Sequence, residues 1–173
     1  MRTRSAVRVV GPLHWVVYPA LISMAATLVL GTPGVRFFGL PLPEPVFPMV
    51  LAFAWPLIRP SMLGPLALLA TCLFVDLYHG APLGLTAVAA LGVYGGVLIG
   101  RPFIVGQDVR ALFAWWMGLL VVAFTFDYLF MMLQTHVAPT IVGVLLQFIP
   151  TAMLFPLAWL LYQRFDDGDV RFR

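Results

Sequence analysis

The stretch from Ala111 to Leu133, ALFAWWMGLLVVAFTFDYLFMML, contains one charged residue, Asp127, and no proline. A helix needs about 20 predominantly apolar residues to cross the hydrocarbon core of a bilayer. This stretch meets that length without interruption, and we predict that it forms the longest and straightest of several membrane-spanning helices. Most of the chain shares its apolar character, which predicts an integral membrane protein.

The composition excludes an ordinary soluble domain. Of the 173 residues, 62% are hydrophobic and 10% are charged, whereas about 25% are charged in soluble proteins. Six crossings would use roughly 110 to 130 residues, and the remainder suffices only for short loops and tails. We therefore expect one membrane domain over residues 1–173, of the all-α class, with six transmembrane helices.

Glycine, proline and polar residues divide the chain into six apolar runs. The predicted spans are residues 13–30, 42–58, 62–78, 83–100, 111–133 and 140–162, followed by a polar tail over residues 163–173. The second span contains Pro43, Pro45, Pro48 and Pro56. Because proline removes a backbone donor and kinks a helix, we expect this span to begin irregularly and to be kinked near its end. Such backbone is tolerated in a membrane only where protein or water satisfies it, so this span should pack against its neighbours.

The arginines predict the orientation. All ten basic residues are arginine, and they are scattered singly, which gives no indication of nucleic-acid binding. If the amino terminus is cytoplasmic, the cytoplasmic side receives Arg2, Arg4, Arg8, Arg59, Arg101, Arg110, Arg164, Arg171 and Arg173. The outer side receives Arg36. Since cytoplasmic loops carry an excess of basic residues, we expect both termini to be cytoplasmic.

Three acidic residues fall in the outer half of the predicted membrane domain. Glu44 opens the second span, Asp76 lies near the outer end of the third, and Asp127 lies in the outer half of the fifth. Acidic residues inside a membrane are costly and often functional. They are interpreted either as groups that cap or pin helices, or as the lining of an outer polar cavity.

Three glycines lie on one face of the fourth span. Gly92, Gly96 and Gly100 are spaced by four residues, and Gly95 widens the strip. Small residues at this spacing allow helix backbones to approach closely. The strip is interpreted either as an internal helix-packing surface or as a face that binds the transmembrane helix of a partner.

The sequence does not indicate an enzyme. It contains no nucleotide-binding glycine loop, no His-Glu-x-x-His zinc helix and no Gly-x-Ser-x-Gly nucleophile elbow. His79 and His136 are interpreted as interface residues, because two lone histidines are weak evidence for zinc. The single cysteine, Cys72, is interpreted as a packing residue. No catalytic residue, metal or cofactor is expected.

Two segments resemble the family of the rod-shape-determining protein MreD. The second span, from Glu44 to Pro60, resembles the second span of that family, although Glu44 stands where aspartate or asparagine is more usual and Ala54 replaces a second aromatic residue. The turn between the third and fourth spans resembles the best-marked segment of the family. The matching residues there are Asp76, Gly80, Pro82, Leu83, Gly84 and Leu85.

The spacing in this turn has a physical interpretation of its own. Asp76 and Gly80 are one helical turn apart, so the aspartate can bond backbone groups that are freed at a helix end. Gly80 permits the left-handed residue that closes a helix, and Pro82 then stops it and opens the next helix. We expect a rigid helical hairpin, which suits a scaffold and equally the wall of a binding cavity.

The resemblance implies a role in bacterial cell elongation. MreD-like proteins lie in the inner membrane with the single-span protein MreC and the filament protein MreB, and that assembly positions RodA and a class B penicillin-binding protein for peptidoglycan synthesis. On this view the chain is a non-catalytic scaffold in contact with membrane lipid and with the transmembrane helix of MreC. The family is also similar in fold to the substrate-binding subunits of energy-coupling-factor transporters. The alternative function is therefore a membrane subunit that binds a vitamin or a lipid-like ligand.

Overall fold

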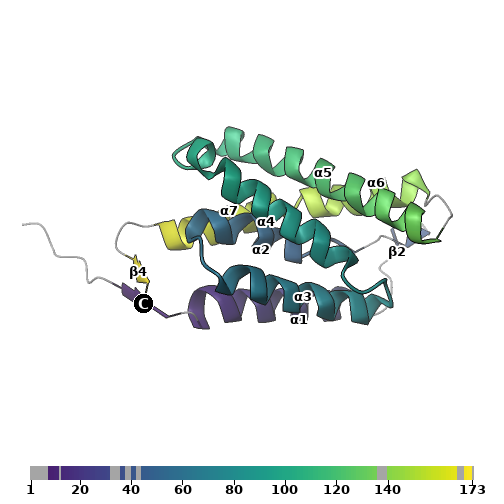
Figure 1. Ribbon diagram of the computed structural model, residues 1–173, viewed down its shortest axis with the longest axis horizontal. Coiled ribbons are helices and arrows are strands. Elements are labelled where there is room, and N and C mark those ends of the chain that lie inside the picture. The colour runs from purple at the N-terminus through teal and green to yellow at the C-terminus, as the bar shows by residue number, and fades with distance from the viewer. Residues whose placement is uncertain are drawn as a thin grey trace, which may run out of the picture.

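The computed structural model is a bundle of helices that lie roughly along one direction (Figure 1). It describes residues 8–11, 13–31, 36–37, 40–41, 44–135, 140–166 and 170–172. The first helical segment is a π-helical turn, Leu13–Val17, that continues into α1, Tyr18–Gly31. The others are α2 Pro48–Ile58, α3 Leu63–His79, α4 Leu85–Ile104, α5 Val109–Thr135, α6 Ile141–Ala152 and α7 Phe155–Asp166.

Among the described residues, four segments are long and apolar enough to cross a membrane. They are His14–Gly31, Leu85–Ile104, Val109–Gln134 and Ile141–Phe165, the last of which combines α6 and α7. Helices α2 and α3 are apolar but shorter. The membrane-helix character predicted from composition is therefore confirmed for four segments, and six complete crossings stay a prediction.

Helix α2 forms the centre of the bundle. Every residue from Pro48 to Leu57 is buried, and the helix packs against α4, α7 and α3. Residues 44–47 are not helical, as the prolines predicted, and the predicted packing of this segment against its neighbours is confirmed. With 11 residues, α2 is only about 17 Å long at 1.5 Å per residue. It cannot cross a hydrocarbon core of about 30 Å alone.

The predicted end of the fourth span was too early. Helix α4 continues through Arg101 and Pro102 to Ile104, so the connection to α5 is much shorter than the predicted loop over residues 101–110. The Arg101 guanidinium donates to the Leu57 carbonyl at the end of α2, 3.5 Å away. Helix α5 has 27 residues and is the longest described helix, as predicted.

The predicted sixth span is broken into two helices. Helix α6 ends at Ala152, Met153 and Leu154 form a turn, and α7 begins at Phe155. The reason is Pro156, which has no N–H to donate to the carbonyl four residues earlier. That carbonyl belongs to Ala152, and it accepts a hydrogen bond of 3.1 Å from the indole Nε1 of Trp116 on α5. The neighbouring helix thus replaces the missing backbone donor.

The same arrangement occurs in α1. Pro19 has no N–H to donate to the carbonyl of Trp15, and this carbonyl lies in the π-helical turn that precedes α1. It accepts a hydrogen bond of 2.9 Å from the indole Nε1 of Trp55 on α2. Trp55 is fully buried, so water cannot provide this donor in its place.

Two pairs of short strands were not predicted. Strands β1, Arg8–Val10, and β4, Val170–Phe172, pair in parallel and join the two ends of the described chain. Strands β2, Arg36–Phe37, and β3, Leu40–Pro41, form a small antiparallel pair. The β1–β4 pair lies at the same end of the bundle as the α2–α3 and α4–α5 connections (Figure 1). Both tails therefore lie at the end where Arg59, Arg101 and Arg110 are located.

We expect the Trp55 bond to be measurable in a double-mutant cycle. Trp55→Phe should lower the free energy of unfolding in detergent by about 1–3 kcal/mol, because it removes the buried hydrogen bond from the Trp55 indole to the Trp15 carbonyl. Pro19→Ala supplies a backbone N–H at position 19, so the cost of Trp55→Phe should be smaller in that background. Equal costs in the two backgrounds would contradict this account, and the control is Trp115→Phe on α5, where the indole is 36% exposed and packs beside Gly100.

Candidate functional site

The turn between α3 and α4 has the geometry that the sequence predicted for Gly80. Its φ is +63°, in the left-handed region. The amide of Ala81 donates to the Asp76 carbonyl at 2.9 Å, and the amide of Gly80 donates to the Leu77 carbonyl at 3.3 Å. These are the two bonds by which a left-handed glycine closes a helix.

Asp76 joins the end of α3 to the start of α4. Its side chain is 0% exposed. One carboxyl oxygen, Oδ2, accepts from the Gly84 amide at 2.8 Å, and the other, Oδ1, accepts from the Thr86 amide at 3.3 Å. The first amides of a helix have no partner within the helix, and a carboxylate is a strong acceptor for them. Asp76 therefore acts as the cap of α4 from the preceding helix.

The remaining motif residues shape the turn. Gly84 has a φ of +91°, which favours glycine, and precedes the first residue of α4, Leu85. The Pro82 carbonyl accepts from the Leu85 amide at 3.1 Å, so Pro82 lies just before the helix rather than inside it. Leu83 is 64% exposed and packs little against the bundle. The sequence did not reveal that Thr86 is the second amide bound by Asp76.

Glu44 is bound at the same end of the bundle by a different partner. Its Oε2 lies 3.1 Å from Nε2 of His79, the last residue of α3. The other ring nitrogen, Nδ1, lies 3.0 Å from the Val75 carbonyl. A Cβ placed on Gly31, the last residue of α1, would lie 2.9 Å from the Glu44 carboxylate. Glu44 thus holds the segment before α2 against the ends of α1 and α3.

Asp127 on α5 is the predicted acid whose electrostatic surroundings include Asp76. It is half-buried on α5, and its carboxyl is within electrostatic range of Asp76. Cys72, buried one turn before Asp76, is within range of both. The structure thus brings two of the three predicted acids together, whereas Glu44 pairs with His79. None of the three acids lines the α1–α7 groove or the two hollows along α5 that border α4 and α6.

The glycines of the α4 strip lie in two different environments. A Cβ on Gly96 would lie 2.7 Å from Leu119 of α5, and one on Gly100 would lie 3.1 Å from Trp115. These two glycines therefore allow α4 and α5 to pack closely. A Cβ on Gly92 or Gly95 would meet nothing within 4 Å, so this part of the strip is open.

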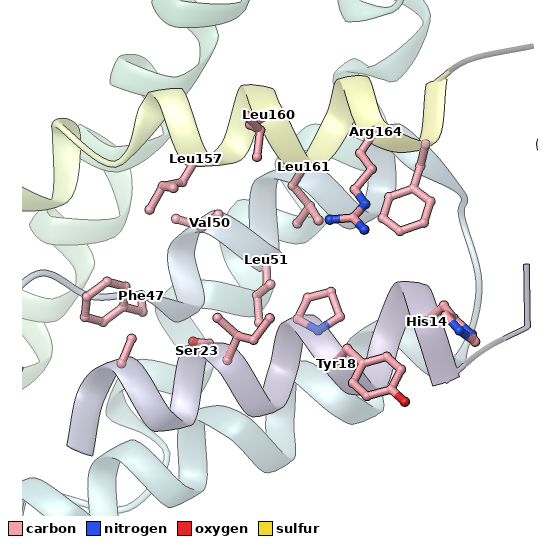
Figure 2. A pocket seen from close by; sticks show the side chains of 14 residues that line it. His14, Tyr18, Ser23, Phe47, Val50, Leu51, Leu157, Leu160, Leu161 and Arg164 are labelled. Atoms are coloured by element: carbon pink, nitrogen blue, oxygen red, sulfur yellow. The ribbon is translucent and has the colours of Figure 1, made fainter. Parts of the chain in front are cut away.

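A deep groove between α1 and α7 could not be inferred from the sequence. It has a volume of about 550 Å³, and its floor is formed by α2 (Figure 2). Helices α1 and α7 are far apart in the chain, and both pack on α2. No run of residues in the sequence indicates a groove, because its walls are set by how two distant helices diverge over a third.

The described residues contain no group of three potential metal ligands. His79 is engaged by Glu44 and the Val75 carbonyl. His136 lies outside the described residues. The arrangement of the described side chains therefore gives no candidate for a metal centre.

The chain matches no protein-family model, no curated protein and no solved structure. A functional interpretation therefore depends on the residues themselves. The features available for it are the capped α3–α4 hairpin, the open part of the α4 strip and the α1–α7 groove.

Removing the Asp76 carboxylate should destabilise the fold strongly. Asp76→Ala leaves two amides at the buried start of α4 without an acceptor, and we expect a loss of about 2–4 kcal/mol in unfolding free energy. Asp76→Asn, which keeps one acceptor oxygen, should lose less. The matched control is Asp108→Ala at the exposed start of α5, where Asp108 Oδ1 accepts from the Ala111 amide at 3.1 Å. Water can replace that cap, so the loss should be about 1 kcal/mol or less, and equal losses at the two positions would refute the role of burial.

Proposed function

We propose that this chain is a multi-pass inner-membrane scaffold of the MreD type, which binds the transmembrane helix of MreC and helps to position peptidoglycan synthesis during cell elongation. The observation that carries the proposal is the α3–α4 hairpin. In it Asp76 caps the start of α4, and Gly80 and Gly84 adopt the left-handed backbone conformations of the turn. MreB, RodA and a class B penicillin-binding protein belong to the proposal as further members of the assembly.

The acidic side chains Asp76 and Glu44 bind other parts of the protein, which supports a scaffold over a catalyst or a transporter subunit. The Asp76 carboxyl is fully buried and accepts from α4, and the Glu44 carboxylate faces His79. A site for a polar ligand would need such groups directed into a reachable hollow. Glu44 and Asp76 instead fix the relative positions of α1, α3 and α4, which is what a rigid binding platform requires.

The open part of the α4 strip supports a docking face for one helix. Val88, Gly92, Gly95 and Ile99 follow each other at intervals of four, three and four residues, which places them on one helical face. Val88 and Ile99 are 58% and 81% exposed. Two glycines between two exposed apolar side chains would let a partner helix approach the α4 backbone closely. The binding role that the sequence left open for the strip is therefore assigned to Gly92 and Gly95, not to Gly96 and Gly100.

The proposed orientation places both termini in the cytoplasm. The end of the bundle that carries the β1–β4 pair also carries the arginine-containing connections (Figure 1). The arginine excess of cytoplasmic loops supports this assignment. On this view the α3–α4 turn and the Glu44–His79 pair face the outer side of the inner membrane.

The docking face can be tested with one glycine substitution and a matched control. Gly92→Leu should reduce recovery of MreC at least fivefold in a pull-down with a tag on the carboxyl tail, because the side chain prevents close approach of the partner helix. Gly118→Leu on α5 is the control, since a Cβ there also meets nothing within 4 Å. Gly96→Leu should instead lower stability, because it collides with Leu119.

The same pull-down separates the two candidate functions. Recovery of MreC from wild type and from Gly118→Leu, with loss from Gly92→Leu, would support the scaffold and its docking face. Equal recovery from all three would remove the α4 face from the proposal. Recovery of ATPase and coupling subunits in place of MreC would overturn the scaffold and favour the substrate-binding subunit of a transporter.

A further inference from the structure

The groove between α1 and α7 is apolar along most of its length and polar at one end. The apolar part is lined by side chains such as Ile22, Val50 and Leu157, and Phe47 lies at its far end (Figure 2). Arg164 on α7 and His14 on α1 line the groove from opposite sides toward its other end (Figure 2). A long apolar channel with a basic end is complementary to an amphiphile with an anionic head.

Arg164 is placed to bind an anion at the mouth of the groove. It lies in the last turn of α7, and its guanidinium points from α7 toward the space above α2 (Figure 2). No carboxylate among the side chains that the structure describes lies within ion-pair distance of it. A guanidinium presents several donors in a plane and binds phosphate groups in a bidentate manner.

Ser23 is a polar residue in the apolar part of the groove. It lines the groove from α1 and is 6% exposed. Its hydroxyl is buried and has no hydrogen-bond partner among the described residues. Because this oxygen is buried, it is not accessible from the groove, so the tail of an occupant would meet no polar group at Ser23.

The size of the groove favours a hydrocarbon chain over a helix. Its volume of about 550 Å³ lies within the range of roughly 300–1,000 Å³ found for ligand pockets. A transmembrane helix is a cylinder about 10 Å wide and 30 Å long, which is several times larger. A lipid tail can enter between α1 and α7 from the bilayer without leaving an apolar environment.

We propose that this groove binds one anionic phospholipid from the leaflet next to Arg164. The phosphate contacts the Arg164 guanidinium, and one acyl chain lies over α2 between α1 and α7. The basic end of the groove is at the arginine-rich end of the bundle, where an anionic leaflet surface attracts basic residues. This site is separate from the α4 face and does not depend on the identity of a protein partner.

Native mass spectrometry of the purified full chain tests the proposal. The protein is equilibrated in mild detergent with equimolar phosphatidylglycerol and phosphatidylcholine, and the lipid that remains bound is measured. Wild type should retain one phosphatidylglycerol in preference to phosphatidylcholine. Arg164→Gln should reduce that retention about fivefold, the change expected for one arginine near an anionic head group. Arg110→Gln, at the exposed start of α5, is the matched charge control and should have no effect.

A second pair of variants tests the apolar part of the groove. Ala26→Trp would fill the tail channel from α1 and should reduce retention of both lipids, whereas Leu21→Trp on the exposed side of α1 should not. Circular dichroism and size-exclusion elution establish that each variant is folded. Equal loss from Arg164→Gln and Arg110→Gln, or no preference for phosphatidylglycerol, would overturn the proposal. So would a bound polypeptide or second copy that Ala26→Trp displaces.

Discussion

The structure depends on satisfying backbone hydrogen bonds where the surroundings offer no water. The central helix, α2, is short and buried from Pro48 to Leu57, and prolines interrupt the helices around it. In hydrocarbon each unsatisfied carbonyl would cost several kcal/mol. Two of the carbonyls freed by proline are bound by indole groups from neighbouring helices, those of Trp55 and Trp116. Each such bond fixes one helix against another, so the interruptions that weaken single helices define how the helices pack.

The same principle explains the chemistry of the α3–α4 turn. A buried carboxylate is costly unless it is hydrogen-bonded, and Asp76 meets this condition by accepting from the first amides of α4. Helix α4 in turn packs against α2, α3 and α5. Because Asp76 fixes the start of α4, it also helps to position the helices that pack against α4. An acid that at first suggests a binding site is used to hold the platform on which binding would occur.

The molecule has two separate apolar surfaces, for which we propose different partners. The open glycines of α4 suit a helix, because they permit close backbone approach along a face. The groove between α1 and α7 suits a lipid, because it is narrow, apolar and basic at one end. Since the two surfaces are formed by different helices, a protein partner and a lipid can be bound at the same time. A scaffold that uses both would be anchored to its leaflet while it positions another protein.

The sequence by itself determined the class of protein, the approximate position of each helix and the turn at Gly80, because these depend on local composition and on residues within one helical turn. It also indicated that the proline-rich second segment would be irregular and surrounded by protein. Only the tertiary structure decided that α2 is too short to cross a bilayer, that the last segment breaks before Pro156, and that Gly96 faces α5 whereas Gly92 is open. It alone formed the groove between α1 and α7. These features depend on which distant side chains reach a freed carbonyl or fill a space, and a linear pattern contains no information about that choice.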